Sequence, residues 1–438
     1  YDLRNQFGHQ CAVEKQALLE ALPVLEVRTA ADLKRLHGTL CFIRAFPDNG
    51  EIHALATAAL NSFYLRVAAL CDAQQSLVTD SGIAGSDIQY SFSFEVAAWL
   101  ARRYPGLVCM DWEDFEDTDR LDELLEHLLE PAETDYFDSG EIGTEEWLQI
   151  VSEHGSGTDF DWLMTQLKLQ PVHNRFWTAL YNAADIPLRC RLSDSKLSTS
   201  ANIYEAGEIV GRHSRMQSRL AGAKKEIVSP LKSINRLDRV HGSRLIDVAM
   251  ASLAVRHRET LHFNYANADE VYLADVGRGV QVAVTGLLPE NRYPLECTMG
   301  FLILSNGVPI GYGGASVLFR QVNTGINIFD EYRGSEAAWL WVQVMRVFHT
   351  LTGCTRYIAN PYQFGSENTE ALQSGAFWFY YRLGYRPIEP SVRALAIREF
   401  AKLKSNRKHR TPVSTLKRLA SCDMHLTLPG ARQSELFD

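Results

Sequence analysis

Apolar residues recur at three- to five-residue spacing through the first part of the chain, close to the repeat of one helical face. The spacing is clearest from Ile52 to Leu70 and predicts helix there, with further helices over residues 94–103 and 121–129. A short apolar run at residues 107–110 has the length of a strand. We therefore expect residues 1–205 to form a mainly helical N-terminal domain.

The pattern changes after residue 260, where short apolar runs alternate with turn residues. Residues 301–304 and 308–310 are apolar, and the Asn306-Gly307 pair between them favours a two-residue β-hairpin turn. Further strands are expected near residues 315–319 and 326–329. This part of the chain therefore begins as a series of short strands.

A helix is expected from about residue 335 to Leu351, ended by Gly353. It is apolar nearly all round, which is typical of a helix buried in a layered domain. A strand at residues 356–359 and a last helix over residues 368–383 follow. Strand, turn, buried helix, strand and helix in this order indicate an α/β domain over residues 261–400.

The formal net charge of −9 conceals an uneven distribution. Residues 111–161 hold 19 acidic side chains and one basic side chain, a local net charge of −18, so the rest of the chain sums to +9. Trp112, Trp147 and Trp162 lie in or beside this stretch, whereas disordered acidic tails are poor in aromatic residues. We expect a folded region with a solvated acidic face. No His or Cys stands there at ligand spacing, so we expect no metal site.

Two segments are basic. Residues 212–258 hold 11 Lys or Arg and three acidic residues, and glycine and proline interrupt them. We expect residues 206–260 to be a basic helical connector, whose cations face water, the acidic half of the chain or an anionic partner. Residues 401–438 form a basic tail with five cations between Lys402 and Arg410. The tail is interpreted as solvated, or alternatively as a contact for phosphates, an acyl carrier protein or tRNA.

Cysteine usage and hydropathy bear on the compartment. The eight cysteines include no CxxC pair, and a chain of 438 residues can build a core without disulfides. No window approaches 18 uninterrupted apolar residues, so no membrane-spanning helix is expected. These features favour a cytoplasmic protein. Metalloprotease, nucleophile-elbow and Walker motifs are absent from the sequence.

Two motifs bracket the expected buried helix and the strand after it. Tyr332-Arg333-Gly334 precedes the helix, and Ala376-x-x-x-Tyr380-x-x-x-Gly384-Tyr385 lies on the last one. This arrangement resembles the GNAT superfamily of N-acetyltransferases over about 130 residues, and only in the C-terminal part of the chain. The resemblance implies an α/β (α+β) acetyltransferase-like domain with a mixed, mostly antiparallel sheet.

The resemblance also implies a donor site for acyl-coenzyme A, or for acyl-phosphopantetheine on a carrier protein. It assigns Ile328 and Phe329 to the strand that pairs with the pantetheine arm, and Tyr380 to the acid that protonates the leaving thiolate. Backbone N–H groups at a helix N-terminus suit a pyrophosphate. The loop that would present them comprises Arg333, Gly334, Ser335, Glu336, Ala337 and Ala338.

This chain departs from the family pattern at Glu336, where a glycine is usual. A carboxylate about 5 Å from a phosphate charge would cost about 1–3 kcal/mol. Alternatively, Glu336 faces solvent in the first helical turn, where an acid is favourable. The first possibility keeps a carrier protein open as the donor. Residues 360–368 also form a longer connection than is usual, which we interpret as a fixed loop beside the acyl site.

Acyl transfer to an amine needs a neutral amine, a polarised carbonyl and an acid for the leaving sulfur. Tyr380 is the expected acid, and a backbone N–H on the strand ending at Phe329 would polarise the carbonyl. Glu296 is the first candidate for the base and Asp330 the second, with a water relay as an alternative. We therefore expect an N-acyltransferase that acts on an amine or another small-molecule acceptor.

Two alternatives to a thioester-dependent acyltransferase remain open. The domain could be a catalytically silent GNAT-like module that binds a ligand or partner, or an aminoacyl-tRNA-dependent transferase. The basic tail lacks interleaved aromatic residues, which argues against single-stranded nucleic acid as a partner.

Overall fold

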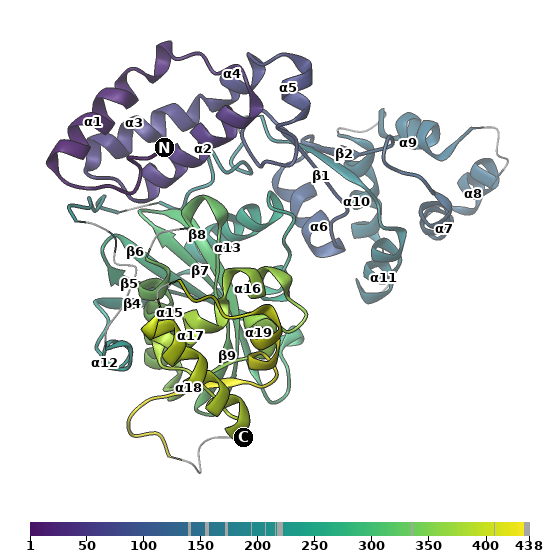
Figure 1. Cartoon of the computed structure of the whole chain (residues 1–438). Coiled ribbons are helices and arrows are strands. Elements are labelled where there is room, and N and C mark those ends of the chain that lie inside the picture. Colours follow the sequence, from purple (N-terminus) through teal and green to yellow (C-terminus); the bar gives the residue numbers. More distant parts are fainter. Residues whose placement is uncertain are drawn as a thin grey trace.

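The computed structural model describes residues 1–138, 142–153, 157–170, 174–193, 195–205, 207–214, 216, 222–333, 336–406 and 408–432. Three regions are visible in Figure 1: a group of N-terminal helices, a small sheet with helices around it, and a large sheet with its own helices. The first two regions together correspond to the expected N-terminal domain.

Helices make up the first region, as expected. Thr29 and Asn49 cap two of them, each accepting a hydrogen bond from the backbone N–H three residues later. The helix expected from Ile52 to Leu70 is two helices separated at Ser62. The elements are α1 (His9–Glu20), η1 (Leu22–Val24), α2 (Ala30–Ala45), α3 (Gly50–Asn61), α4 (Phe63–Ala68) and α5 (Asp72–Ser76).

The second region surrounds a three-stranded antiparallel sheet in the order β1-β3-β2. The strand expected at residues 107–110 is confirmed as β2, whereas the other two strands were not expected. The strands are β1 (Asp87–Tyr90), β2 (Val108–Met110) and β3 (Leu188–Arg191). The helices are α6 (Phe94–Arg103), α7 (Asp119–Leu128), α8 (Pro131–Asp138), α9 (Thr144–Glu153), α10 (Asp159–Leu169) and α11 (Asn174–Ala184).

The third region is built on a mixed, mostly antiparallel sheet in the order β12-β13-β11-β9-β8-β7-β6-β5-β4, with β10 also paired to β8. Among its described strand pairs, only β9 and β11 run parallel. The expected sheet type is therefore confirmed. The strands are β4 (Ser233–Arg236), β5 (Ala266–Gly277), β6 (Val280–Leu287), β7 (Cys297–Ser305), β8 (Val308–Leu318), β9 (Gln321–Thr324), β10 (Asn327–Ile328), β11 (Arg356–Ala359), β12 (Arg386–Pro387) and β13 (Met424–Thr427).

The expected hairpin is confirmed. Ser305 pairs with Val308, and the turn residues Asn306 and Gly307 have φ values of 47° and 77°. Positive φ at both positions is the type I′ turn that Asn-Gly favours. The separate strand expected near residues 315–319 is instead the continuation of β8.

Helix α15 (Ala337–Thr352) is buried along most of its length and ends at Gly353 in the left-handed conformation, as expected. The helix expected over residues 368–383 is two helices, because Gly375 has a φ of 68°. The remaining helices are α12 (Ala223–Ile227), α13 (Arg239–Ala254), α14 (Leu261–Asn264), η2 (Pro289–Asn291), η3 (Asp330–Tyr332), η4 (Pro361–Phe364), α16 (Thr369–Ser374), α17 (Ala376–Leu383), α18 (Pro390–Ser405) and α19 (Val413–Leu419).

Both basic segments contribute strands to the large sheet. Strand β4, from the expected helical connector, forms one edge, and β13, from the expected tail, lies between β12 and β11. Among the described residues, the ion pairs of Arg212, Arg244 and Arg256 are with Glu336, Glu205 and Glu331, outside the acidic residues 111–161. The acidic stretch therefore does not neutralise these cations.

The N-terminal helices lie against the tip of the β7–β8 hairpin (Figure 1). The backbone oxygen of Ala45, the last residue of α2, accepts hydrogen bonds from Ser305 Oγ at 2.6 Å and Asn306 Nδ2 at 3.1 Å. Beside them, the Arg212 N–H donates to the Pro47 oxygen at 2.8 Å and the Tyr204 N–H to the Gly307 oxygen at 2.8 Å. One hydrophobic cluster extends from Leu19 to Leu428 across all three regions.

All eight cysteines are free thiols. Within the described ranges, no helix has the length and apolar character needed to cross a membrane.

Candidate functional site

An opening lies in the large sheet between β11 and the chain that joins β9 to β10. Strand β8 pairs with β9 and β10 in one continuous antiparallel register, although residues 325–326 between them belong to neither strand. Strand β11 pairs with β9 only as far as Ile358 opposite Asn323. Beyond that pair, the two parallel strands no longer pair with each other.

A cavity of about 370 Å³ lies at this opening. Four residues of the 360–368 loop form part of its wall. The lining residues come from α14, β8, residues 323–327, the loop and α17: His262, Gly314, Ala315, Ser316, Asn323, Thr324, Gly325, Ile326, Asn327, Asn360, Tyr362, Gln363, Asn368 and Tyr380.

Tyr380, the expected acid, lies in this cavity wall. Its side chain is 4% exposed, and its hydroxyl donates a hydrogen bond to Gln363 Oε1 at 3.0 Å. Its ring packs edge-on against Trp341 and Phe364. Burial raises the pKa of Tyr380 far above its ordinary value, so the phenol is neutral and holds its proton at physiological pH.

His262 lies in the same cavity, and the sequence analysis missed it. It is on the one-turn helix α14, and its ring lies against β8 at Gly314, where an added Cβ would be 2.1 Å from His262 Cε1. Burial lowers the pKa of His262, which keeps the imidazole neutral at physiological pH. Within the described chain, its Nδ1 is buried without a hydrogen-bond partner. The cavity therefore holds a neutral imidazole and a neutral phenol.

Neither expected base lines the cavity. Glu296 is exposed just before β7, and Asp330 is exposed in η3, where it forms an ion pair with Arg333 at 2.9 Å. Nothing in their positions supports a catalytic role. Both were assigned because they are close in sequence to the expected strands. Closeness in sequence does not show that His262 lies against β8 in the cavity.

The two residues assigned to the pantetheine strand also lie outside the cavity lining. Ile328 belongs to β10, and Phe329 stacks on Tyr312 with the Arg256 guanidinium 4.0 Å from its ring. The Phe329 N–H donates to the Ile310 oxygen at 3.1 Å, so it is already engaged. The lining residues in this part of the chain are Asn323 to Asn327, immediately before those expected.

Glu336 is buried at the N-terminus of α15, so it does not face solvent. Its carboxylate accepts from Arg212 Nη1 at 2.8 Å and from Arg278 Nη1 at 3.0 Å, and its side chain is 4% exposed. Arg278 comes from the β5–β6 turn, and Arg212 from the segment before α12. These partners, 124 and 58 residues away in sequence, were not foreseen.

The other residues of the expected pyrophosphate loop lie in different environments. Arg333 is exposed and forms an ion pair with Glu370 at 2.6 Å, while Ala337 and Ala338 begin α15. Gly334 and Ser335 lie outside the described residues. The protein's own Glu336 is therefore the anion at this end of α15.

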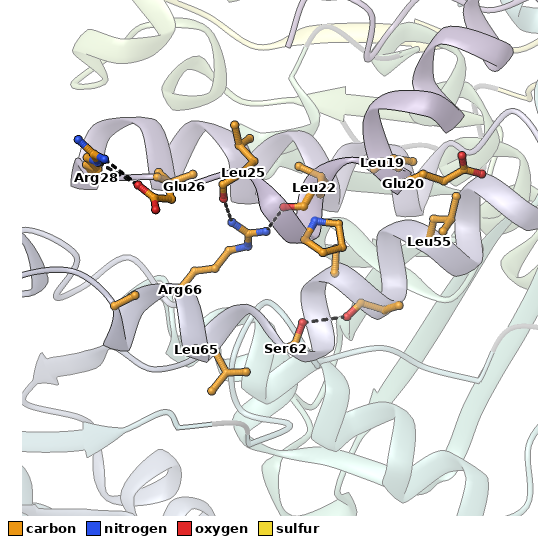
Figure 2. A pocket seen from close by; sticks show the side chains of 15 residues that line it. Leu19, Glu20, Leu22, Leu25, Glu26, Arg28, Leu55, Ser62, Leu65 and Arg66 are labelled. Atoms are coloured by element: carbon orange, nitrogen blue, oxygen red, sulfur yellow. Dashed lines mark hydrogen bonds and ion pairs between the residues drawn. The ribbon is translucent and has the colours of Figure 1, made fainter.

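A larger hollow of about 910 Å³ lies between η1 and the helices α3 and α4. Figure 2 shows Arg66 reaching across it to donate to the backbone oxygens of Leu25, at 2.8 Å, and Leu22, at 2.6 Å. The Glu26–Arg28 ion pair at its margin is exposed. Aliphatic side chains form most of its wall, and its polar groups have structural roles, so no acid–base pair marks it as a catalytic site.

Among the residues that the structure describes, no group of three His, Cys, Asp or Glu side chains is arranged to hold a metal ion. Comparisons of the chain with protein-family models, curated proteins and solved structures find no match.

Proposed function

We propose that the protein is an N-acyltransferase that moves an acyl group from a thioester to an amine in the cavity beside β11. The observation that carries the proposal is the presence of His262 and Tyr380 in the lining of one cavity, at the point where two parallel strands part. The GNAT-like order of strand, buried helix, strand and tyrosine-bearing helix supports it.

His262 replaces Glu296 and Asp330 as the base. A neutral imidazole accepts a proton through its unprotonated ring nitrogen, and burial keeps it neutral at physiological pH. His262 would take the proton of the attacking amine as the new C–N bond forms.

Tyr380 keeps its role as the acid. As the C–S bond breaks, its hydroxyl would donate its proton to the leaving sulfur, and Gln363 holds that hydroxyl in place beforehand. The transferred acyl group would then leave as an amide, and the donor as a free thiol.

The position of Glu336 favours acyl-phosphopantetheine on a carrier protein over acyl-coenzyme A. In the family that the domain resembles, the pyrophosphate binds where α15 begins, and here a buried carboxylate with two arginine partners lies at that helix end. Both arginines are already paired with that carboxylate, so a pyrophosphate would gain little from them. We expect acyl-pantetheine and acyl-coenzyme A to react with similar kcat/KM, and a 100-fold advantage for coenzyme A would contradict this donor assignment.

A thiol-release assay with acyl-pantetheine and a panel of amines tests the reaction. We expect His262→Gln and Tyr380→Phe each to lower kcat by about 10²–10⁴-fold, the usual contribution of general acid–base catalysis. The exposed His9 and Tyr293 supply matched controls, His9→Gln and Tyr293→Phe, which should leave kcat unchanged. Unchanged turnover in both cavity variants would reject the mechanism.

The competing function is a GNAT-like binding module that releases no thiol. The engagement of the Tyr380 hydroxyl by Gln363 favours it, because a fixed hydroxyl can also be a purely structural group. Saturable binding of pantetheine thioesters without thiol release from any of them would favour the binding module.

A further inference from the structure

A third hollow, of about 690 Å³, lies at the β12–β13–β11 edge of the large sheet, away from the candidate catalytic cavity. The two cavities lie at opposite ends of β11: Arg356 begins the strand and lines this hollow, whereas Asn360 follows its end and lines the other. A four-residue strand separates its ends by about 10 Å. The hollow is therefore a separate site.

Its polar lining is strongly cationic. Lys224, Arg356, Arg386 and Arg393 contribute four permanent positive charges and Glu389 one negative charge, and His425 lies among them. These side chains come from α12, β11, β12, β13, α18 and the residue before α18, so the tertiary fold brings them together. Figure 1 shows α12 and α18 at the end of the molecule farthest from the N-terminal helices.

Strand register places part of this charge on one face. Arg386 is paired with His425 across β12 and β13, and Arg356 with Thr427 across β11 and β13. Paired positions share a face, as do residues two apart on a strand. Arg356, Arg386 and His425 therefore project from the same side of the sheet edge.

Two of the guanidinium groups are held in position by the backbone. Arg386 Nη1 donates to the oxygens of Tyr381 at 2.9 Å and Tyr385 at 2.7 Å, and its guanidinium lies 4.2 Å from the Tyr381 ring centre. Arg393 Nε donates to the Pro387 oxygen at 2.9 Å. In the described part of the chain, neither arginine has a carboxylate partner, and nor does Lys224. Their charges remain available to a ligand.

We propose that this hollow, the β11–β13 edge site, binds a small molecule that carries two or more linked phosphate groups. Guanidinium groups match phosphate oxygens with two parallel hydrogen bonds. The positive charges of Lys224, Arg386 and Arg393 exceed the one negative charge of Glu389 by two, so a ligand with two or more negative charges balances them. The volume lies in the usual range for small-molecule pockets, about 300–1,000 Å³. The site is independent of the proposed acyl transfer.

Isothermal titration calorimetry of the full chain with inorganic pyrophosphate, in a low-salt buffer free of phosphate, tests the proposal. We expect saturable binding at one site, about 10-fold or more tighter than that of orthophosphate, because the second phosphate group reaches further cations. Absence of saturable binding, or equal affinity for orthophosphate, would overturn the proposal.

Charge-removing variants locate the binding. Lys224→Gln and Arg393→Gln should each weaken pyrophosphate binding about 10- to 100-fold, since a hydrogen bond to a charged group contributes at this level. Arg398→Gln is the matched control, because Arg398 is exposed on the same helix, α18, but does not line the hollow. The Lys224 side chain has no partner in the described chain, so its replacement should leave folding intact. An equal loss in the Arg398 variant would show non-specific attraction and reject the site.

Discussion

Glu336 is a buried carboxylate between two arginines, and its neutralisation should be costly. Glu336→Gln leaves Arg212, whose side chain is 9% exposed, without a full negative partner. Breaking a buried pair on one side typically costs about 3–5 kcal/mol, and we expect a loss of that size in the free energy of unfolding measured with urea. The exposed pair of Glu370 with Arg333 is the control, because Glu370→Gln should cost at most about 1 kcal/mol. Equal effects of the two variants would contradict the prediction.

His37 should make the protein less stable in acid. It is buried in α2, with Nε2 at 2.9 Å from Ser200 Oγ, and burial lowers its pKa to about 3, with Glu331 opposing the shift and Arg44 and Arg256 reinforcing it. Above pH 6.5 both the folded and unfolded chains hold a neutral imidazole. As the pH falls below 6.5, His37 takes up a proton in the unfolded chain but not in the folded chain. The free energy of unfolding therefore decreases with falling pH until the pH reaches the pKa of the folded state.

At pH 4.5 this proton uptake by the unfolded chain lowers the free energy of unfolding by about 2–3 kcal/mol. His37→Gln should therefore reduce the difference in unfolding free energy between pH 7 and pH 4.5 by that amount, as measured by urea denaturation at both values. His9→Gln, at an exposed position, should leave the difference unchanged. An undiminished pH dependence in the His37 variant would exclude its role.

The pH dependence of turnover should report His262 if it is the base. Burial lowers its pKa, so the active, neutral form persists as the pH falls and is lost only below 6.5. We expect the acid limb of kcat against pH to have its midpoint below 6.5 in the wild-type protein and to disappear in the residual activity of His262→Gln. An acid limb that remains at the same pH would point to another group.

The two cavity residues differ in how far the sequence revealed them. Tyr380 is assigned by the family resemblance, which rests on the local pattern Ala376-x-x-x-Tyr380-x-x-x-Gly384-Tyr385. His262 is 118 residues away in sequence, on a one-turn helix with no periodicity of its own. It reaches the cavity only because Gly314 leaves room for its ring on a strand far along the chain. That juxtaposition depends on tertiary structure, so spacing alone could not show it.

Strand β8 should be sensitive to a side chain at Gly314. The Cβ of Gly314→Ala would lie 2.1 Å from His262 Cε1, so the ring has to move out of the cavity wall. We expect kcat to fall at least 10-fold, and stability by about 1–3 kcal/mol as in other overpacked sites. Gly50→Ala, where an added Cβ meets nothing within 4 Å, should change neither quantity. Full activity in the Gly314 variant would show that the ring position does not matter.

Elements with strong local signals were predicted well. The Asn306-Gly307 turn, the apolar helix α15 and strand β11 all appear where expected, because turn chemistry and apolar runs are written in neighbouring residues. Strands β12 and β13 have two and four residues, and such short segments carry little periodicity. Strand β13 forms because β11 offers it an edge to pair with, and β12 in turn pairs with β13, so both depend on the assembled sheet.

At the scale of the whole molecule, the N-terminal helices and the large sheet should open together. Ala45 accepts two hydrogen bonds from the β7–β8 hairpin, and one hydrophobic cluster spans the regions. Hydrogen exchange measured by mass spectrometry should therefore give peptides from α2 and β7 the same opening free energy in denaturant. Exchange of α2 at a clearly lower free energy, with β7 still protected, would show that the N-terminal helices unfold as a separate unit.

The acidic and basic residues lie in different regions of the structure. The described acidic residues between positions 111 and 161 belong to the region of the small sheet, where Asp111 and Glu113 pair with Arg189. In the C-terminal region, Arg212 and Arg256 pair with Glu336 and Glu331, and four further cations gather at the β11–β13 edge site. The net charge of the chain is thus the sum of an acidic and a basic region whose described charges do not pair with each other.

The contact between Ala45 and the hairpin tip also has a consequence for synthesis of the chain. Residue 45 emerges from the ribosome long before residue 306, and at about 5–20 residues per second the interval is roughly 10–50 s. During that time the end of α2 lacks the Ser305 and Asn306 donors that later bind it. The first helices therefore cannot complete their packing during translation until most of the chain has been made, which leaves an apolar surface for chaperones to shield.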